Sequence, residues 1–183
     1  MNAPFDVTDI RIETARLILR PWQQSDLQDF YEYAKVDGVG QMAGWLPHES
    51  MDVSQRILDA FIEGKKNFAL ELKETGKVIG SLGLEDRDAQ ELSGMGREIG
   101  YVLSKNYWGK GLMPEAVKAV IKYCFEVLNY DWLTCGHFVR NDQSRRVIEK
   151  CGFVYWKDVA HTTRYGAVEQ TKIYNIVKGE WNV

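Results

Sequence analysis

Residues 97–128 read REIGYVLSKNYWGKGLMPEAVKAVIKYCFEVL, and this stretch decides the fold. Ile99, Tyr101 and Leu103 occupy every second position, a period that predicts a β-strand. A glycine-containing turn follows, and an amphipathic helix begins directly after it. Pro114 is compatible with the start of this helix, where its missing N–H group leaves no hydrogen bond unmade. The apolar stripe of the helix consists of Leu112, Ala116, Val117, Val120, Ile121, Cys124, Phe125 and Leu128.

Gly109 and Gly111 form the turn between this strand and this helix. The first turn of a helix leaves backbone N–H groups unpaired, and the helix dipole makes this end partly positive. Because neither glycine has a side chain, a phosphate group could approach these N–H groups closely. A Gly-x-Gly turn alone is weak evidence, since most such turns only reverse the chain. A phosphate site therefore needs support from a second motif.

The second motif is RNDQSRRVIEKCGF at residues 140–153, after a predicted strand. Together the two motifs resemble the cofactor-binding motifs of the GNAT superfamily of N-acetyltransferases. The first resembles that family's Arg/Gln-x-x-Gly-x-Gly/Ala pattern, with Asn106 where Arg or Gln is usual. The second resembles its Asn-x-x-Ser/Ala pattern, followed by a helix and Gly-Phe. Glu98-Ile99-Gly100-Tyr101 and Tyr107-Trp108-Gly109-Lys110-Gly111 look most like the branch that contains the RimJ and RimL ribosomal-protein acetyltransferases.

The resemblance implies the GNAT fold, a mixed α/β (mixed α+β) architecture with a twisted sheet of about seven strands and about four helices, splayed at its central strands. We expect one GNAT domain over residues 1–183, with residues 1–10 as a short N-terminal extension. Ser25-Asp26-Leu27-Gln28 is expected to form a capping box for the first helix. Strands are predicted over 16–20, 68–72, 78–84, 97–103, 132–139, 154–159 and 171–177, and helices over 27–34, 53–62, 112–128 and after Asn141.

The resemblance also implies binding of acetyl-CoA as co-substrate. The N–H groups of the glycine turn should hold the pyrophosphate, the backbone of 101–103 should pair with the pantetheine arm, and Asn141 should hydrogen-bond that arm. Arg145, Arg146 or Lys110 could bind the 3′-phosphate, although a solvated helix face explains each arginine equally well. The expected cofactor-binding residues are Tyr101, Val102, Leu103, Trp108, Gly109, Lys110, Gly111, Leu112, Met113, Asn141, Ser144, Arg145 and Arg146.

Acetyl transfer by direct attack needs a proton donor for the departing thiolate and an acceptor for the proton of the amine. Family members often use a tyrosine on the helix after the Asn motif as the acid, but Ile148 holds that position here. Ser144 is the nearest candidate, and its alternative role is a hydrogen bond to backbone or cofactor. Glu98 is the first candidate base, acting through a water, and Glu85 is its rival. A salt bridge with Arg97 is the structural alternative for Glu98.

The acceptor is expected to be a primary amine. A lysine amine has a pKa of about 10.4 and an α-amine about 7.7 to 8.0, a gap worth roughly 3.5 kcal/mol, so an α-amine reacts with a weaker base. The α-amine of a protein N-terminus is therefore favoured, with a small amine (amino acid, polyamine or antibiotic) or a catalytically silent CoA-binding module as alternatives. Trp45, His48 and Glu85 are the expected acceptor-binding residues, though a single aromatic is more often ordinary packing.

Composition narrows the cellular context. The net charge is −3, but residues 105–150 carry eight Lys or Arg against five Asp or Glu, which suits an anionic cofactor and does not predict direct nucleic-acid binding. Three cysteines without paired spacing and no membrane-length apolar run indicate a cytoplasmic protein. Cys135 and His137 share a strand face, but a zinc site lacks further ligands, so no metal is expected. A homodimer is an open alternative, because relatives of this branch often dimerise.

Overall fold

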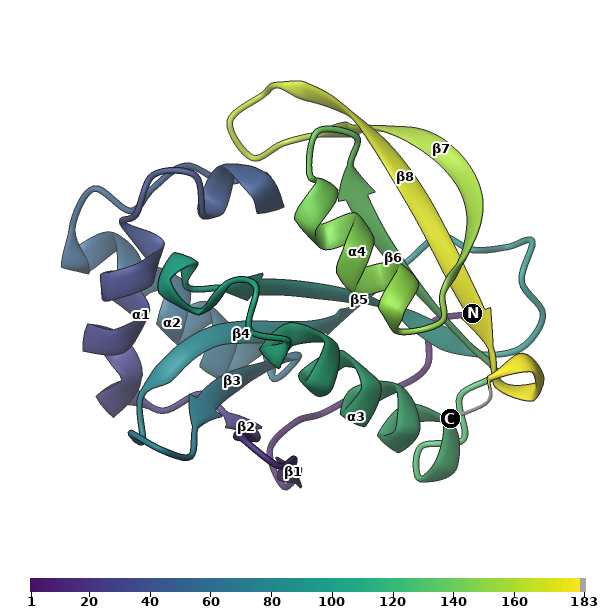
Figure 1. Ribbon diagram of the computed structural model, residues 1–183, viewed down its shortest axis with the longest axis horizontal. Helices are drawn as coiled ribbons and strands as arrows, with labels where there is room; N and C mark the ends of the chain where they lie inside the picture. Colours follow the sequence, from purple (N-terminus) through teal and green to yellow (C-terminus); the bar gives the residue numbers. More distant parts are fainter. Residues whose placement is uncertain (182–183) are drawn as a thin grey trace.

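The structure is a computed structural model and describes residues 1–181. It contains an eight-stranded sheet with the order β1-β2-β3-β4-β5-β6-β8-β7, together with four α-helices (Figure 1). The strands are β1 (Ile12–Glu13), β2 (Leu17–Pro21), β3 (Asn67–Leu72), β4 (Val78–Glu85), β5 (Gly96–Leu103), β6 (Trp132–Phe138), β7 (Val154–Thr162) and β8 (Val168–Val177). The α-helices are α1 (Leu27–Ala34), α2 (Met51–Gly64), α3 (Leu112–Glu126) and α4 (Asp142–Lys150). The predicted mixed α/β fold is confirmed.

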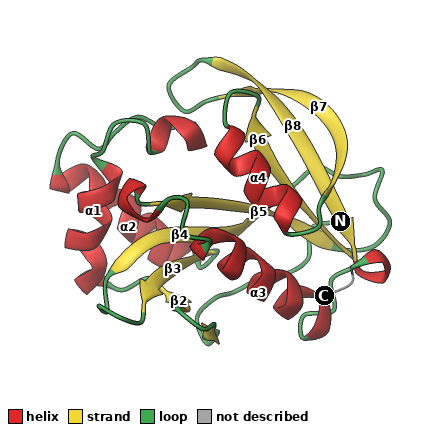
Figure 2. Cartoon of the chain, viewed as in Figure 1, coloured by secondary structure: helices red, strands yellow, loops and turns green. Residues whose placement is uncertain are grey.

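The helices cover the two faces of the sheet (Figure 2). Alternate residues of a strand point to opposite faces, and β3 shows this directly. Phe68 and Leu70 belong to the cluster that contains the buried faces of α3 and α4, whereas Ala69 belongs to the cluster under α1 and α2. The apolar stripe predicted for residues 112–128 is buried, although α3 itself ends at Glu126. Among residues 1–181, no helix combines the length and apolarity that crossing a lipid bilayer requires.

The junction between β5 and β6 positions the site. These two strands are parallel, and their register covers only Gly96–Ile99 against Trp132–Cys135. Beyond Ile99, β5 stays paired with β4 as far as Leu103, while β6 continues beside β8. The two strands therefore diverge in the middle of the sheet, as the splay predicted from the family resemblance requires. One edge of β5 is left without a strand partner over residues 100–103.

Three details differ from the sequence-based expectations. The sheet has an additional short strand, β1, which is too brief to produce a periodic pattern. Ser25 does not cap the first helix; the backbone N–H of Gln23 instead donates to the Asp26 carboxylate at 2.8 Å, and this carboxylate also binds Arg20. Residues 1–10 pack on the core rather than projecting from it, since Ala3 and Val7 are buried.

Candidate active site

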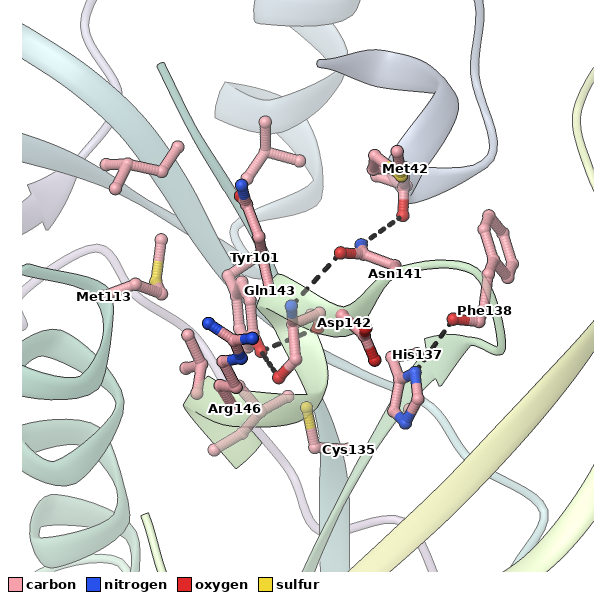
Figure 3. A pocket seen from close by; sticks show the side chains of 18 of the residues that line it. Met42, Tyr101, Met113, Cys135, His137, Phe138, Asn141, Asp142, Gln143 and Arg146 are labelled. Atoms are coloured by element: carbon pink, nitrogen blue, oxygen red, sulfur yellow. Dashed lines mark hydrogen bonds between the residues drawn. The ribbon is translucent and has the colours of Figure 1, made fainter. Parts of the chain in front are cut away.

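One cleft of about 710 Å³ occupies the gap between β5 and β6. Its walls come from β5, from the turn before α3, from the first turns of α4 and from the 3-10 helix Gly40–Ala43 (Figure 3). Residues far apart in the sequence thus meet in one cavity. Among the expected cofactor residues, those that line the cleft are Tyr101, Val102, Leu103, Trp108, Gly109, Gly111, Leu112, Met113, Asn141, Ser144 and Arg146.

The turn before α3 presents unpaired amides to the cleft. Gly109 and Gly111 both have φ of +74°, a left-handed conformation that residues with a side chain adopt at a cost. A Cβ atom on Gly109 would meet nothing within 4 Å, so this backbone is open to a ligand. Among residues 1–181, no group accepts a hydrogen bond from the backbone N–H of residues 109–113. Together with the dipole of α3, these groups are suited to an anion.

Arg16 and Glu115 hold this turn in place through hydrogen bonds, a role that the sequence did not indicate. Arg16 Nη1 donates to the Lys110 carbonyl at 2.9 Å, and its Nε donates to the Glu115 carboxylate at 2.7 Å. The Lys110 side chain does not line the cleft, and its Nζ lies 5.1 Å from the centre of the Tyr107 ring. The backbone of Lys110, rather than its side chain, is therefore the part held at the site.

The first turn of α4 forms the opposite wall. The Asn141 side chain caps this helix by accepting from the Ser144 N–H at 3.1 Å, and its Nδ2 donates to the Met42 carbonyl at 3.4 Å (Figure 3). Arg146 and Lys150 line the cleft without an ion-pair partner within residues 1–181, whereas Arg145 does not line it. Arg145 forms ion pairs along the helix surface with Asp142 and Glu149, the solvated alternative considered from the sequence.

Two side chains of β5 face α3 and α4 with different roles. Leu103 packs in the core, and its carbonyl accepts from the Trp108 indole N–H at 2.8 Å, which fixes the end of the strand. The Tyr101 hydroxyl oxygen lies 2.8 Å from Ser144 Oγ and 3.2 Å from the Ser144 carbonyl oxygen, within hydrogen-bond reach of both. Burial raises the pKa of Tyr101 well above its usual value, so the phenol stays protonated. Sequence reasoning assigned only the Tyr101 backbone to the site.

Glu98 lines the deep end of the cleft on the opposite face of β5. Its carboxylate lies 3.1 Å from the Arg87 guanidinium, with 23% of the side chain exposed. Burial raises the pKa of Glu98, which Arg87 opposes and the nearby Glu85 reinforces. The alternative pairing with Arg97 is wrong, because Arg97 binds Asp86 and the Ala3 and Leu84 carbonyls.

Buried polar atoms without hydrogen-bond partners gather around Glu98. Within residues 1–181, Arg87 Nε and Thr134 Oγ1 have no such partner, and Glu98 Oε2 has only its 3.1 Å ion pair with Arg87 Nη1. Thr134 is opposite Glu98 in the last paired stretch of β5 and β6, so these atoms lie where the strands begin to diverge. Buried donors and acceptors are normally satisfied, and unsatisfied ones in a cavity point to a ligand or water. This end of the cleft is therefore suited to a polar group.

The expected acceptor residues lie outside the cleft lining. Glu85 is opposite Glu98 in the β4–β5 register but is exposed. Trp45 and His48 pack in the cluster under α1 and α2, where the His48 ring contacts Phe30 and its Nδ1 lies 2.7 Å from Ser54 Oγ. Burial lowers the pKa of His48, so the ring is neutral at neutral pH. The cleft lining instead includes Met42, Ala43, Arg87, Phe138, Val159, His161, Thr171 and Ile173.

Cys135 and His137 line the cleft on the α4 side of β6. His137 Nδ1 donates to the Phe138 carbonyl at 2.8 Å, and burial raises the pKa of Cys135 well above its usual value. The thiol is therefore a neutral packing group, not a nucleophile. Over the described part of the chain, no three His, Cys, Asp or Glu side chains cluster so that they could hold a metal ion.

Comparisons with known proteins agree with this arrangement. The family model described as acetyltransferase (GNAT) domain matches residues 16–154. An uncharacterised N-acetyltransferase named p20 from Bacillus licheniformis is 33% identical over 146 residues, which are 76% of this chain and 80% of that protein. The family-model match includes the turn before α3 and the start of α4.

Solved structures share the fold at lower identity. A GNAT-family acetyltransferase from Bacillus anthracis superposes with a TM-score of 0.82 at 21% identity, covering 93% of this chain and 100% of that one. A ribosomal-protein alanine acetyltransferase from Vibrio fischeri has a TM-score of 0.72 at 22% identity, covering 96% and 100%. A spermidine N-acetyltransferase from Vibrio cholerae, in complex with CoA and spermine, has a TM-score of 0.73 at 20% identity, covering 91% and 98%.

Proposed function

This chain belongs to the GNAT family of N-acetyltransferases, and from this premise we propose that it acetylates the α-amine of a protein N-terminus with acetyl-CoA. The amine nitrogen attacks the thioester carbonyl carbon, the carbon–sulfur bond breaks, and no acyl-enzyme forms. The proton lost by the amine goes to Glu98, directly or through a water, and the thiolate takes a proton from Ser144. The observation that carries the proposal is one cleft that joins the amides before α3 to the Glu98 carboxylate.

Two parts of the cleft support acetyl-CoA as co-substrate. The unpaired N–H groups of residues 109–113 suit a pyrophosphate, and the backbone at Gly109 is open to it, since a Cβ atom there would meet nothing within 4 Å. Arg146 and Lys150 line the α4 wall and suit a further phosphate group through charge-assisted hydrogen bonds. Lys150 is thus added to Arg146 as a candidate phosphate-binding residue. Arg145, which is ion-paired, is removed from that set. The free edge of β5 over residues 100–103 suits an amide-bearing chain laid beside it.

The polar groups at the deep end favour an α-amine. Glu98 Oε2 can accept from the amine, and Arg87 Nε–H can donate to the carbonyl oxygen that lies beside every peptide α-amine. An isolated lysine side chain or a polyamine lacks that carbonyl. The cleft is also poorly suited to several ammonium groups, since Glu98 and Asp142 are its only lining carboxylates among the described residues. Its lining cations are Arg87, Arg140, Arg146 and Lys150.

An acceptor panel tests the proposal. Release of the CoA thiol is measured with peptides that have free N-termini, with the same peptides blocked at the α-amine but containing lysine, with free amino acids and with spermidine. We expect kcat/KM for the free N-termini to exceed that for the blocked peptides and spermidine at least about tenfold, because the carbonyl contact and the lower amine pKa both act there. Preference for spermidine or free amino acids would support the small-amine alternative. CoA binding without turnover of any amine would support a silent binding module.

The branch assignment and the assembly remain part of this proposal. The ribosomal-protein acetyltransferase from Vibrio fischeri and the spermidine enzyme from Vibrio cholerae share the fold to the same degree. The proposal of an α-amine as the acceptor therefore rests on the Arg87–Glu98 pair and not on these two structures. A cytoplasmic location and a homodimer stay predictions, which fractionation and sedimentation would test.

A further inference from the structure

The phenol of Tyr101 reaches the hydroxyl that the proposed reaction uses as its acid. Tyr101 lies on β5 and Ser144 on α4, and their oxygen atoms are 2.8 Å apart across the cleft wall. Figure 3 shows the Tyr101 side chain at the first turn of α4, beside Gln143 and Arg146. Ile148 holds the α4 position where relatives carry a tyrosine, and it is fully buried in the core. A phenol nevertheless enters the cleft, from a different element of the fold.

A serine hydroxyl alone is a poor proton donor to a thiolate. An alkyl thiol has a pKa of about 8.5 and a phenol about 10, whereas the pKa of water, the simplest aliphatic-type hydroxyl, is about 15.7. Proton transfer from an isolated hydroxyl is therefore uphill by about seven pKa units, against about one and a half for a phenol in water. Burial raises the pKa of Tyr101 above that of a free phenol, so a proton supplied by Tyr101 to Ser144 Oγ removes part of this difference.

We propose that Tyr101 is the positioning residue behind Ser144: its O–H donates to Ser144 Oγ, which directs the Ser144 hydrogen towards the CoA sulfur and replaces that hydrogen when the thiolate takes it. The inference rests on the proposed acetyl transfer. In the balanced step, the carbon–sulfur bond breaks, sulfur gains the Ser144 proton, and Ser144 oxygen gains the Tyr101 proton. The resulting phenolate recovers a proton from solvent through the open cleft when CoA leaves.

The surroundings of Tyr101 fit this role. The titratable groups that face its hydroxyl are Cys135 on β6 and Cys151 after α4, and burial keeps both thiols neutral. The phenol also stays protonated, because burial raises its pKa. The Tyr101 oxygen lies 2.8 Å from Ser144 Oγ and 3.2 Å from the Ser144 carbonyl oxygen, so its single hydrogen can reach either acceptor, and the proposed step requires that it go to Oγ. If Tyr101 donated only to the Ser144 carbonyl, the Ser144 hydroxyl would donate its hydrogen to the Tyr101 oxygen and would not direct it towards the CoA sulfur.

The test measures the pKa of the bound CoA thiol, which needs no acceptor amine. Hydrogen bonds to a thiolate lower its pKa, and the thiolate is followed by its ultraviolet absorbance during a pH titration of the full-length protein with CoA. In the wild-type complex, we expect a thiol pKa about one unit below that of free CoA. Tyr101→Phe should return it towards the free value while the CoA dissociation constant changes less than about twofold, and kcat should fall about 10- to 100-fold.

Tyr130→Phe is the matched control. Tyr130 is a buried phenol that donates to the Pro4 carbonyl at 2.9 Å and does not line the cleft, so its loss should leave the thiol pKa and kcat unchanged. If Tyr101→Phe does not fold, fluorotyrosine at position 101 keeps the shape with a more acidic phenol and should lower the thiol pKa further. A thiol pKa that is insensitive to both changes would overturn the role of Tyr101. Absence of CoA binding by the wild-type protein would instead reject the proposed function.

Discussion

Arg16 and Glu115 are joined across the start of α3, although ninety-nine residues separate them in the sequence. The guanidinium binds one carboxylate oxygen at 2.7 Å, and the Arg16 backbone N–H donates to the other at 2.8 Å. Because Arg16 also holds the Lys110 carbonyl, the turn that presents the anion-binding amides is attached to the edge of the sheet. The geometry of the proposed phosphate site thus depends on a contact outside both motifs.

Removing this contact should loosen the turn. We expect Glu115→Ala to lower the free energy of unfolding by about 1–3 kcal/mol, since it removes several charge-assisted hydrogen bonds. CoA affinity should fall as well, because the amides lose their fixed orientation. Denaturant unfolding and calorimetry measure the two effects. The control is Glu126→Ala, whose exposed pair with Lys122 spans 4.0 Å and is worth at most about 1 kcal/mol. If the two variants lowered stability and CoA affinity equally, Glu115 would have no specific role in holding the turn.

Gly111→Asp should strongly weaken CoA binding. The new carboxylate would stand beside the amides that we assign to the pyrophosphate, and it would repel the phosphate charge. Gly76→Asp is the matched control, because Gly76 also has positive φ (+69° against +74°) and lies in the β3–β4 hairpin turn. Each variant should lose about 1–2 kcal/mol of stability from backbone strain. Calorimetric CoA affinity should drop more than about tenfold for Gly111→Asp alone; equal affinities would place the phosphate elsewhere.

Ser144→Ala should lower turnover more than it weakens CoA binding. The alanine keeps the N-cap bond, since the Ser144 backbone N–H donates to Asn141, but it removes the hydroxyl that faces the cleft. We expect kcat to fall about 10²- to 10⁴-fold, the range for a lost general acid, with CoA affinity within a few-fold. The exposed Ser25→Ala serves as the control. Equal losses in turnover and binding would reduce Ser144 to a cofactor contact.

Glu98→Gln should change the pH dependence of kcat. The pKa of Glu98 lies above its ordinary 4.5, chiefly because of burial, so the carboxylate becomes available as a base only above that pH. With saturating amine, kcat of the wild-type protein should rise with pH through this shifted pKa, and Glu98→Gln should lack that limb. Glu85→Gln should move the limb to lower pH, because Glu85 raises the pKa of Glu98. An unaltered profile in Glu98→Gln would exclude it as the base.

The raised pKa of Glu98 also makes the stability of the folded protein depend on pH. The folded state binds the Glu98 proton more tightly than the unfolded state does, so this group's contribution falls as pH rises from 4.5 through the raised pKa and is constant above it. We therefore expect the unfolding free energy of Glu98→Gln, measured relative to that of the wild-type protein, to increase with pH over this acidic range. Urea unfolding of the two proteins from pH 4 to pH 8 measures it. A parallel pH dependence of both proteins would argue against the raised pKa.

The three thiols should be inert in the folded protein. Cys124, Cys135 and Cys151 are buried, and burial raises the pKa of Cys151 to about 12. A thiol reagent should label none of them at neutral pH and all three in denaturant. Labelling of Cys135 in the native state, suppressed by CoA, would show that the cleft opens more widely than in this structure.

The sequence by itself determined the strand, turn and helix of residues 97–126, both motifs, the mixed fold and the order of the main elements. These features follow from local properties, namely hydrophobic period, turn chemistry and the start of a helix, which depend on residues close together in the chain. The lining positions of Gly109, Gly111, Asn141 and Ser144 were expected from the resemblance of the two motifs to those of the family, since the glycine turn alone was weak evidence. The two-residue strand β1 was too short to leave any such pattern.

Only the tertiary structure decided which distant side chains meet. It paired Glu98 with Arg87 instead of Arg97, turned the Tyr101 phenol towards Ser144, and packed Trp45 and His48 beneath the first two helices. No local signal predicts such contacts, because they depend on the strand register, on the divergence of β5 from β6 and on the face that each side chain takes. A one-residue change in register would reverse every one of those faces.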